Sequence, residues 1–366
     1  TLTLTLTLTL TPTPTLTLPY LSITVKSMIS AAIFGFLSFV NFSLGQSQSI
    51  WKYALCSGLG WLLLLLCIRE LMLLISGKRY KTHKNGAILI SGASTGIGKS
   101  AAKNLQNLGY TVYAGVRKQA DADNLQKFCK ELRPIFLDVT DQKSIQTAVE
   151  RIERETQKDG IGLVGLINNA GISAGLPVEL EQIDQVRRTF DVNVFGTYRL
   201  TQACIPLLRK SEGRIIVTGS MAGSVGRPCK NVYTSTAYSL EGFCDTLRLE
   251  LAKWNISVSL LKPAFVKTSI TSKQIGDKLP FLSLKQEDYA KYARYFDSFE
   301  SKKLRQHSKG CTTEVTDRAF AHAITSPYPK TRYYVAKAKG VDAYWVSWIL
   351  WILPDRVKDI VMQSSG

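Results

Sequence analysis

The sequence predicts a doubly wound α/β fold, in which a parallel sheet carries helices on both of its faces. Two observations predict it. From residue 87 onward, short apolar segments typical of buried strands alternate with longer segments of helical period. This alternation indicates strands joined by crossover helices, the unit from which parallel sheets are built. The first strand also leads into a glycine-rich turn, and ligands of such sheets bind beyond the carboxyl ends of the strands.

The glycine-rich turn follows the apolar strand 87–90, which is too short for a helix and is bounded by turn residues. Glycines spaced as G-x-x-x-G-x-G let the backbone turn sharply, approach a ligand closely and pack the next helix on the strand. A pyrophosphate can then lie on the N-terminus of that helix. Alone, the spacing also suits an ordinary loop. We expect contacts to a nucleotide from Gly92, Ser94, Gly96, Ile97 and Gly98.

The remaining elements follow from the same patterns. Strands are expected near 87–91, 111–115, 133–137, 163–168, 214–219, 257–262 and 331–335. Helices are expected near 98–108, 141–155, 186–209, 233–252 and 285–298. The clearest helical period lies in 233–252, whose apolar stripe consists of Leu240, Phe243, Cys244, Leu247 and Leu251.

Composition restricts the partners. The 366 residues include 46 Lys and Arg against 28 Asp and Glu, a formal net charge of +18 that favours anionic surfaces. The basic residues are spread along the chain without an aromatic-interleaved patch, so we expect a membrane and no nucleic acid. Seven cysteines without a C-x-x-C pair indicate a reducing compartment. The three histidines lie far apart in sequence, and no metal is expected.

Two segments precede the α/β domain. Residues 1–27 form a low-complexity tract dominated by alternating Thr and Leu, which we expect to be disordered. Residues 28–77 are expected to anchor the chain in a membrane. The strongest candidate span is 53–75, which reaches the required length of about 20 residues only by including an Arg-Glu pair. A hairpin with 28–45, a buried soluble helix and a cleaved signal peptide at 28–45 are alternatives.

Positive charge follows the candidate span at Lys78, Arg79, Lys81 and Lys84. Lys and Arg next to a span mark its cytoplasmic side. We therefore expect the α/β domain, residues 78–366, to face the cytosol from a membrane, with the endoplasmic reticulum as the favoured one.

The second predicted strand is followed by Arg117 and Lys118, and no acidic residue occurs before Asp121. In dinucleotide-binding sheets, an acidic residue at this point binds the ribose 2′-hydroxyl of NAD, whereas arginine accommodates the 2′-phosphate of NADP. Arg117 therefore favours NADP(H) over NAD(H). The alternative is that it is a solvated surface residue.

Further signals follow the glycine turn in a fixed order. They are Asp138-Val139, Asn168-Asn169-Ala170-Gly171, Asn193-Val194-Phe195-Gly196-Thr197, and Ser220 and Tyr233 thirteen residues apart. With the turn, they resemble the short-chain dehydrogenase/reductase family over residues 78–366, which implies a Rossmann-like fold. The tail, with Lys330-Thr331-Arg332-Tyr333 and Leu353-Pro354-Asp355-Arg356, looks like the branch acting on steroids, retinoids and other lipid carbonyls.

The resemblance also assigns roles. The cofactor would be contacted at its adenine edge by Asp138 and Val139, beside the adenine ribose by Asn169, Ala170 and Gly171, and at the pyrophosphate by Thr268. Ser220 would hold the substrate oxygen, Asn193 would organise a proton-relay water, and Tyr233 would be the general acid or base. These roles suit hydride transfer to a carbonyl, which builds negative charge on oxygen and needs a proton donor and a second hydrogen bond.

Two positions depart from the family pattern. The family's lysine four residues after the tyrosine, which binds the nicotinamide ribose and lowers the tyrosine pKa, is Ala237 here. Since an unperturbed tyrosine has a pKa of about 10, Tyr233 is expected to stay protonated at neutral pH, which suits proton donation to a carbonyl. The nearest cations, Lys262 and Lys230, are expected to be surface lysines. Ala264 replaces a family glycine and would crowd the nicotinamide if the backbone there needed positive φ or close approach.

Two further segments bear on the substrate. By the resemblance, residues from about 266 to 310 form a lid over the substrate, and their apolar side chains suit a lipid-like molecule; a helix that simply packs on the sheet is the alternative. Residues 344–353 include three tryptophans, which suggests a second membrane contact or, equally, burial against the sheet.

The sequence thus predicts a membrane-bound NAD(P)(H)-dependent oxidoreductase that interconverts a hydrophobic carbonyl and alcohol and favours reduction. Retention of Asn193, Ser220 and Tyr233 favours an enzyme. The alternative is a nucleotide-binding pseudoenzyme, acting as membrane scaffold or redox sensor, because of Ala237. The expected partners are a hydrophobic small molecule and a membrane, and in the family the helices at 186–209 and 233–252 offer the surface for a homodimer.

Overall fold

The computed structural model describes residues 58, 60–61, 64–68, 77–173, 175–268, 280–338 and 340–364. The chain divides into two compact units, Thr1–Lys78 and Arg79–Gly366, and the second contains the whole α/β fold. The tract 1–27 and most of the expected anchor 28–77 lie outside the described residues. Within the residues that are described, no helix combines the length and hydropathy needed to cross a bilayer.

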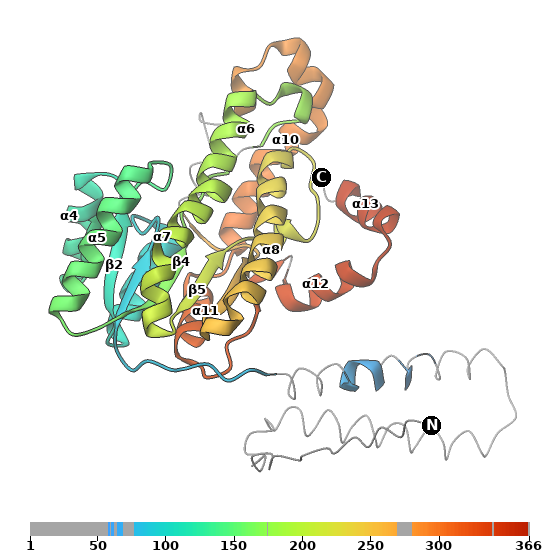
Figure 1. Cartoon of the computed structure of the whole chain (residues 1–366). Coiled ribbons are helices and arrows are strands. Elements are labelled where there is room, and N and C mark those ends of the chain that lie inside the picture. The colour runs from blue at the N-terminus through green and yellow to red at the C-terminus, as the bar shows by residue number, and fades with distance from the viewer. Residues whose placement is uncertain are drawn as a thin grey trace, which may run out of the picture. The chain divides into compact units, whose positions relative to one another are not determined.

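The second unit is built on seven strands in the order β3-β2-β1-β4-β5-β6-β7, all of them parallel (Figure 1). The strands are β1 (Ala87–Ile90), β2 (Thr111–Val116), β3 (Arg133–Phe136), β4 (Leu163–Asn168), β5 (Arg214–Thr218), β6 (Ser257–Pro263) and β7 (Arg332–Val335). The predicted doubly wound sheet and its seven strands are confirmed. The strand order reverses between β1 and β4, the point at which such sheets bind dinucleotides.

Helices cover both faces of the sheet (Figure 1). One face carries α5 (Gln142–Lys158), α7 (Gly196–Ser211) and α8 (Asn231–Leu251), which enclose Leu89, Leu166 and Leu260. The other carries α3 (Gly96–Asn107), α4 (Gln119–Phe128) and α11 (Glu314–Thr325), which enclose Ile88, Ile167 and Leu261. Because successive side chains of a strand point to opposite faces, covering both faces requires strands that are apolar throughout.

Several helices differ from the sequence prediction. The predicted helix 186–209 consists of α6 (Ile183–Phe190) and α7, joined by a π-helical turn, Asp191–Phe195. The predicted helix 285–298 is the longer α10 (Gln286–Lys309). The structure adds α4, α11, α12 (Ala343–Ile352) and α13 (Asp355–Ser364). Only two residues of α4 are buried, so its sequence lacks the wide apolar stripe by which helices are recognised.

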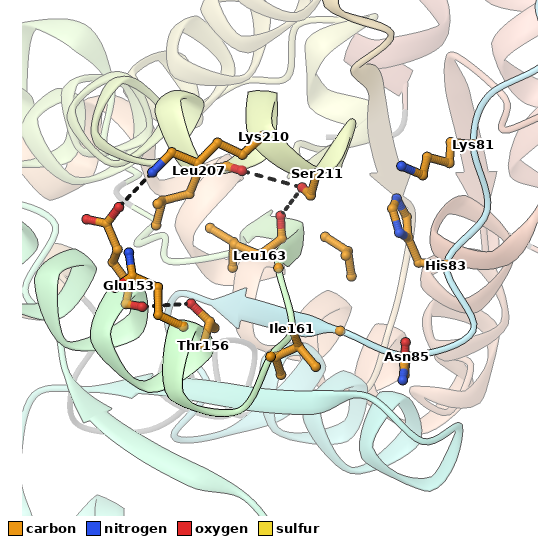
Figure 2. A pocket seen from close by; sticks show the side chains of 15 residues that line it. Lys81, His83, Asn85, Glu153, Thr156, Ile161, Leu163, Leu207, Lys210 and Ser211 are labelled. Atoms are coloured by element: carbon orange, nitrogen blue, oxygen red, sulfur yellow. Dashed lines mark hydrogen bonds and ion pairs between the residues drawn. The ribbon is translucent and has the colours of Figure 1, made fainter.

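At the amino edge of the sheet, a buried arginine holds the start of the second unit. Arg214 is 1% exposed. Its guanidinium donates hydrogen bonds to the carbonyls of Ala323, Ser326 and Lys81 at 2.6–2.7 Å, which offset its burial. A cavity of about 390 Å³ opens at the same edge, with Lys81, His83 and Ser211 in its lining (Figure 2). This cavity lies at the opposite end of the strands from the glycine turn.

Candidate active site

The glycine turn at the carboxyl end of β1 depends on left-handed backbone. Gly92 has φ +65° and Gly96 has φ +59°. A Cβ at Gly92 would lie 2.8 Å from the Cα of Ala170, and one at Gly98 would lie 2.5 Å from the carbonyl oxygen of Gly92. The turn therefore packs directly on the loop after β4, and a side chain at Gly92 or Gly98 would separate them.

The N-terminus of α3 fits an anion. The N-cap residue, Thr95, makes no side-chain capping bond to the first amides of the helix. The N–H groups of the first turn and the positive end of the helix dipole suit a phosphate group, and Ser94 and Ile97 lie next to this helix start. This geometry fits the pyrophosphate of a dinucleotide.

A polar network joins the turn to the loop after β4. The Ser91 hydroxyl accepts hydrogen bonds from the backbone N–H groups of Asn169 and Ala170, each at 3.0 Å. The Asn169 amide donates to the carbonyls of Ser91 and Gly92 at 3.2 and 3.1 Å. These bonds commit the Asn169 side chain to shaping the turn. This role of Ser91 was not predicted from the sequence, because serine beside glycine is common in any turn.

Arg117 and Asp138 follow neighbouring strands, β2 and β3, at the edge where an adenosine would bind. The Asp138 carboxylate accepts hydrogen bonds from the N–H and hydroxyl of Thr140 at 2.9 and 2.7 Å. Burial acts to raise the pKa of Asp138, but these bonds and the Arg117 charge hold it below its usual value. Asp138 is therefore ionised, and Arg117 is exposed and available to a second anion. Val139 is buried, and a Cβ at Gly196 would lie 2.7 Å from its Cγ2.

Asn193 lies in the π-helical turn between α6 and α7, where the helix widens. Its Oδ1 accepts a hydrogen bond from the N–H of Ile172 at 2.8 Å, and its Nδ2 donates to the Ile172 carbonyl at 2.9 Å and to the Thr236 hydroxyl at 3.1 Å. The side chain thus ties the loop after β4, including Gly171, to α8. Thr236 was missed by sequence reasoning, although it lies three residues after Tyr233 on the same helix.

Tyr233 and Ser220 lie together at the carboxyl edge of the sheet. Tyr233 is in the first turn of α8, and its hydroxyl is near enough to the Ser220 side chain for the serine to lower its pKa. Ser220 follows β5 and accepts a hydrogen bond from the N–H of Ala222 at 3.1 Å, which orients it. Burial raises the pKa of Tyr233, and Ser220 opposes this only in part. The tyrosine is therefore protonated at neutral pH, as the sequence predicts.

Ala237 lies one helical turn after Tyr233 and is 5% exposed. The short helical turn Met221–Gly223 packs on its backbone, since a Cβ at Gly223 would lie 2.9 Å from the Ala237 oxygen. One turn further along α8 is Glu241, whose carboxylate forms ion pairs with Lys262 and, at 2.9 Å, with Arg332. No role for Glu241 is predicted from the sequence, because its partners come from β6 and β7.

The expectation that Lys262 is a surface lysine is wrong. It is 2% exposed, and its ammonium group donates to the Ser224 hydroxyl at 2.5 Å as well as pairing with Glu241. The Lys262 side chain extends from β6 toward α8, where it is enclosed. Burying an ammonium group is costly unless it is paired, which explains these contacts. Lys262 is not among the groups that lower the pKa of Tyr233. Lys230 is partly exposed, and a Cβ at Gly175 would lie 2.6 Å from its ammonium nitrogen.

The backbone at Ala264 does not have the positive φ that would favour glycine. Ala264 is not among the described non-glycine residues with positive φ, and its N–H donates to the Val335 carbonyl at 2.9 Å, continuing the β6–β7 pairing. Crowding of the nicotinamide by Ala264 was expected if this position needed positive φ. That condition is not met. Thr268 ends a described stretch, and part of the predicted lid, 269–279, lies outside the described residues.

The described part of the predicted lid contributes to an apolar cluster with the loop after β4. Phe281 and Phe296 are buried and stack with ring centroids 4.7 Å apart. They pack with Leu176 of the loop after β4, and Cys229, four residues before Tyr233, packs against the same cluster. An aromatic cover of this kind gives a substrate site an apolar wall.

Several known proteins are similar to this chain in sequence. A model of the family described as short chain dehydrogenase matches residues 86–278. Mouse estradiol 17-beta-dehydrogenase 2 is 36% identical over 260 residues, covering 68% of this chain and 67% of that protein. Rat mitochondrial D-beta-hydroxybutyrate dehydrogenase is 33% identical over 277 residues, covering 71% and 78%. Human retinol dehydrogenase 5 is 30% identical over 320 residues, covering 82% and 96%.

Solved structures share the fold. A short-chain dehydrogenase from Streptomyces avermitilis matches with a TM-score of 0.55 and 24% identity, covering 69% of this chain and 88% of that one. One from Burkholderia cenocepacia, in complex with NADP, matches with a TM-score of 0.55 and 20% identity, covering 74% and 95%.

Proposed function

Because the chain belongs to the short-chain dehydrogenase family of NAD(P)-dependent oxidoreductases, we propose that it reduces a hydrophobic ketone or aldehyde with Tyr233 as the proton donor. The observation that carries the proposal is the proximity of Tyr233 and Ser220 at the carboxyl edge of the sheet, where the serine acts to lower the tyrosine pKa. Two hydroxyls converge there, next to the switch point between β1 and β4.

The chain's own residues then have distinct tasks. The nicotinamide cofactor supplies the hydride when bound. Ser220 and Tyr233 donate hydrogen bonds to the carbonyl oxygen, and Tyr233 transfers its proton as negative charge builds on that oxygen. Asn193 holds the loop after β4 against α8 and so fixes the position of the Tyr233 helix. The apolar lid excludes water from the reaction.

The raised pKa of Tyr233 supports reduction as the preferred direction. A tyrosine that stays protonated at neutral pH is ready to donate a proton, whereas alcohol oxidation requires its phenolate as base. Ala237 leaves no ammonium one turn away to stabilise that phenolate. Similar rates in both directions at neutral pH would contradict this direction.

NADP(H) is the proposed cofactor, because Arg117 is exposed at the end of β2, where a 2′-phosphate would lie. The chain offers the turn 92–98 to the pyrophosphate and Asp138 to the adenosine. The relatives named for estradiol and retinol, both hydrophobic alcohols, support a substrate of that class, as does the apolar lid.

We further propose that the enzyme works at a cytosol-facing membrane, that of the endoplasmic reticulum, anchored by 28–77. The charge of +18 and the basic residues from Lys78 onward support this location. Exposed apolar residues on the outer surface of the π-helical turn, α7 and α8, namely Phe195, Tyr198 and Leu249, support pairing of two copies there.

A pseudoenzyme is the second candidate, and the buried Ala237 is the observation that favours it. Such a protein would bind NADPH through residues 92–98 and would not convert a substrate. It would act as a membrane scaffold or redox sensor.

The test is NADPH oxidation by the full chain in phospholipid nanodiscs, with retinal, a steroid ketone, a long-chain aldehyde and a small polar 3-keto acid as substrates. We expect turnover of a hydrophobic carbonyl at pH 7 that Tyr233→Phe removes. NADPH fluorescence measures cofactor binding, and we expect binding in both proteins. Binding without turnover, with activity appearing only in Ala237→Lys, would favour the pseudoenzyme. Preference for the 3-keto acid would overturn the substrate class.

A further inference from the structure

The C-terminal helices α12 and α13 carry an apolar surface. On α12, Trp345, Ile349, Trp351 and Ile352 are each more than half exposed, and Trp351 is 77% exposed. On α13, Val357, Ile360 and Val361 are exposed as well. Figure 1 shows the two helices at the edge of the unit, outside the layer formed by α8. Single exposed apolar residues are common, but seven on two consecutive helices form a patch.

The inner side of α12 is narrow. Ala343, Ser347 and Leu350 are buried, and they follow one line along the helix at spacings of four and three residues. Through them α12 rests on β7 and on the small hairpin of β8 (Lys337–Ala338) and β9 (Val341–Asp342). Two alternatives were predicted for 344–353 from the sequence, a membrane contact and burial against the sheet. Only this one line of residues is fully buried. A helix that is apolar all round needs a partner on its other sides.

The chemistry of the patch fits a lipid surface. Tryptophan is enriched where a bilayer meets water, because its ring is apolar and its N–H is polar. With ten residues, α12 is about 15 Å long, half of the hydrocarbon thickness, so it can lie in the interface but cannot span it. The net charge of +18 complements the anionic cytoplasmic leaflet, while the charges within α13, Asp355, Arg356, Lys358 and Asp359, balance one another.

We propose that α12 and α13 lie in the membrane interface, with Trp345 and Trp351 among the lipid headgroups. This contact is separate from the anchor 28–77. It also brings lipid next to the catalytic helix: the side chains of Asp355 and Lys358 act electrostatically on Tyr238, one residue from Ala237. Tyr344 of α12 contacts the Tyr334 ring at a centroid distance of 6.0 Å, and the Lys262 ammonium lies 5.2 Å from that ring.

The test uses the full chain in vesicles of phosphatidylcholine and phosphatidylserine, with bromine on the acyl chains near the headgroup. Five tryptophans are replaced by Phe so that only Trp351 emits. Interfacial helices bury their apolar face to about 5–10 Å, so we expect bromine to quench its emission by about half or more. A matched chain that keeps only Trp254 is the control, because Arg209 and Lys253 cover that ring at 4.0 and 4.2 Å. We expect no quenching of Trp254.

Two results would overturn the proposal. Unquenched emission at the wavelength of water-exposed indole would mean that the surface stays in solvent. Unquenched but blue-shifted emission would mean that protein covers it, either the anchor 28–77 or a second copy. A second measurement needs no variant: a phospholipid with a photoreactive acyl chain should label 343–364 of the unsubstituted chain, and its absence from these peptides would also overturn the proposal. Neither readout depends on turnover. Failure of the membrane contact can therefore be distinguished from failure of the proposed reaction.

Discussion

The two halves of the proposed cofactor site are built differently. The adenine half, consisting of the turn 92–98, Arg117 and Asp138, has close backbone packing and exposed charge that fit a dinucleotide phosphate. The nicotinamide half, consisting of Ser220, Tyr233, Ala237 and Lys262, keeps the two hydroxyls but directs its buried ammonium to Glu241. The proposed roles in cofactor binding and in proton transfer thus belong to separate groups of residues, and substitutions can test them separately.

The largest effect is expected from Tyr233→Phe. The substitution removes the proton donor and keeps the ring, so carbonyl reduction should fall by about 10²–10⁴-fold, the usual contribution of general acid catalysis. NADPH affinity should not change, because the adenine half is untouched. The measurement is kcat/KM for the best carbonyl beside NADPH titration. Activity within about tenfold of the unsubstituted protein would assign the proton to another group.

Lys262→Met tests the contribution of the buried Lys262 ammonium group, which pairs with Glu241. It leaves the partly buried Glu241 with Arg332 as its remaining cation, and breaking an ion pair that is largely buried costs about 3 kcal/mol of unfolding free energy. The control is Lys210→Met, which breaks the exposed pair with Glu153 at 2.9 Å and should cost less than about 1 kcal/mol. Urea denaturation in detergent measures both. Equal losses would show that the Lys262 pair is not special.

Ala237→Lys is expected to restore the family's lysine and to change the reaction direction. In the unsubstituted protein the pKa of Tyr233 is raised, so reduction should hold its rate from pH 6 to 9 while oxidation rises with pH throughout. A nearby ammonium stabilises the phenolate, so alcohol oxidation at pH 7 should increase by about 10²-fold. Ala237→Met, of similar length and no charge, should give no gain. A gain in both variants would mean that packing, not charge, limits oxidation.

Gly92→Ala tests the adenine half. Both the φ of +65° and the 2.8 Å approach to Ala170 oppose a side chain. Gly160 has the same φ of +65° with nothing within 4 Å of a Cβ, so Gly160→Ala reports the backbone strain alone, about 1–2 kcal/mol. We expect Gly92→Ala to weaken NADPH binding by about tenfold or more and Gly160→Ala to leave it unchanged. Equal effects would mean that the close approach is unimportant.

The fold was predictable because its signals are local. Strands such as 87–90 and 163–168 are short apolar runs, and the stripe on 233–252 has a clear period, so each element can be recognised within a few residues of sequence. The helices α4 and α11 were missed because helix propensity and narrow apolar stripes are weak signals without the sheet against which they pack.

The candidate site was predictable only where motif spacing carries it. Ser220 and Tyr233, thirteen residues apart, are near enough in the structure for the serine to lower the tyrosine pKa, and their catalytic roles stay a prediction. The burial of Lys262 was not predictable, because its partners Ser224 and Glu241 come from another loop and another helix. The same holds for the commitment of Asn169 to the turn, which depends on the β1–β4 pairing between residues far apart in sequence.

The smallest effect is expected from Arg117→Ser, which tests cofactor choice within the adenine half. A charge-assisted bond to a 2′-phosphate contributes about 1.5 kcal/mol or more, so KM for NADPH should rise by about tenfold. KM for NADH should change less than about twofold, because NADH lacks that phosphate. Lys118→Ser, one residue further along, is the matched control for loss of a positive charge at this edge. Equal changes for NADPH and NADH would show that Arg117 is a solvated surface residue, since only a residue that contacts the 2′-phosphate can distinguish the two cofactors.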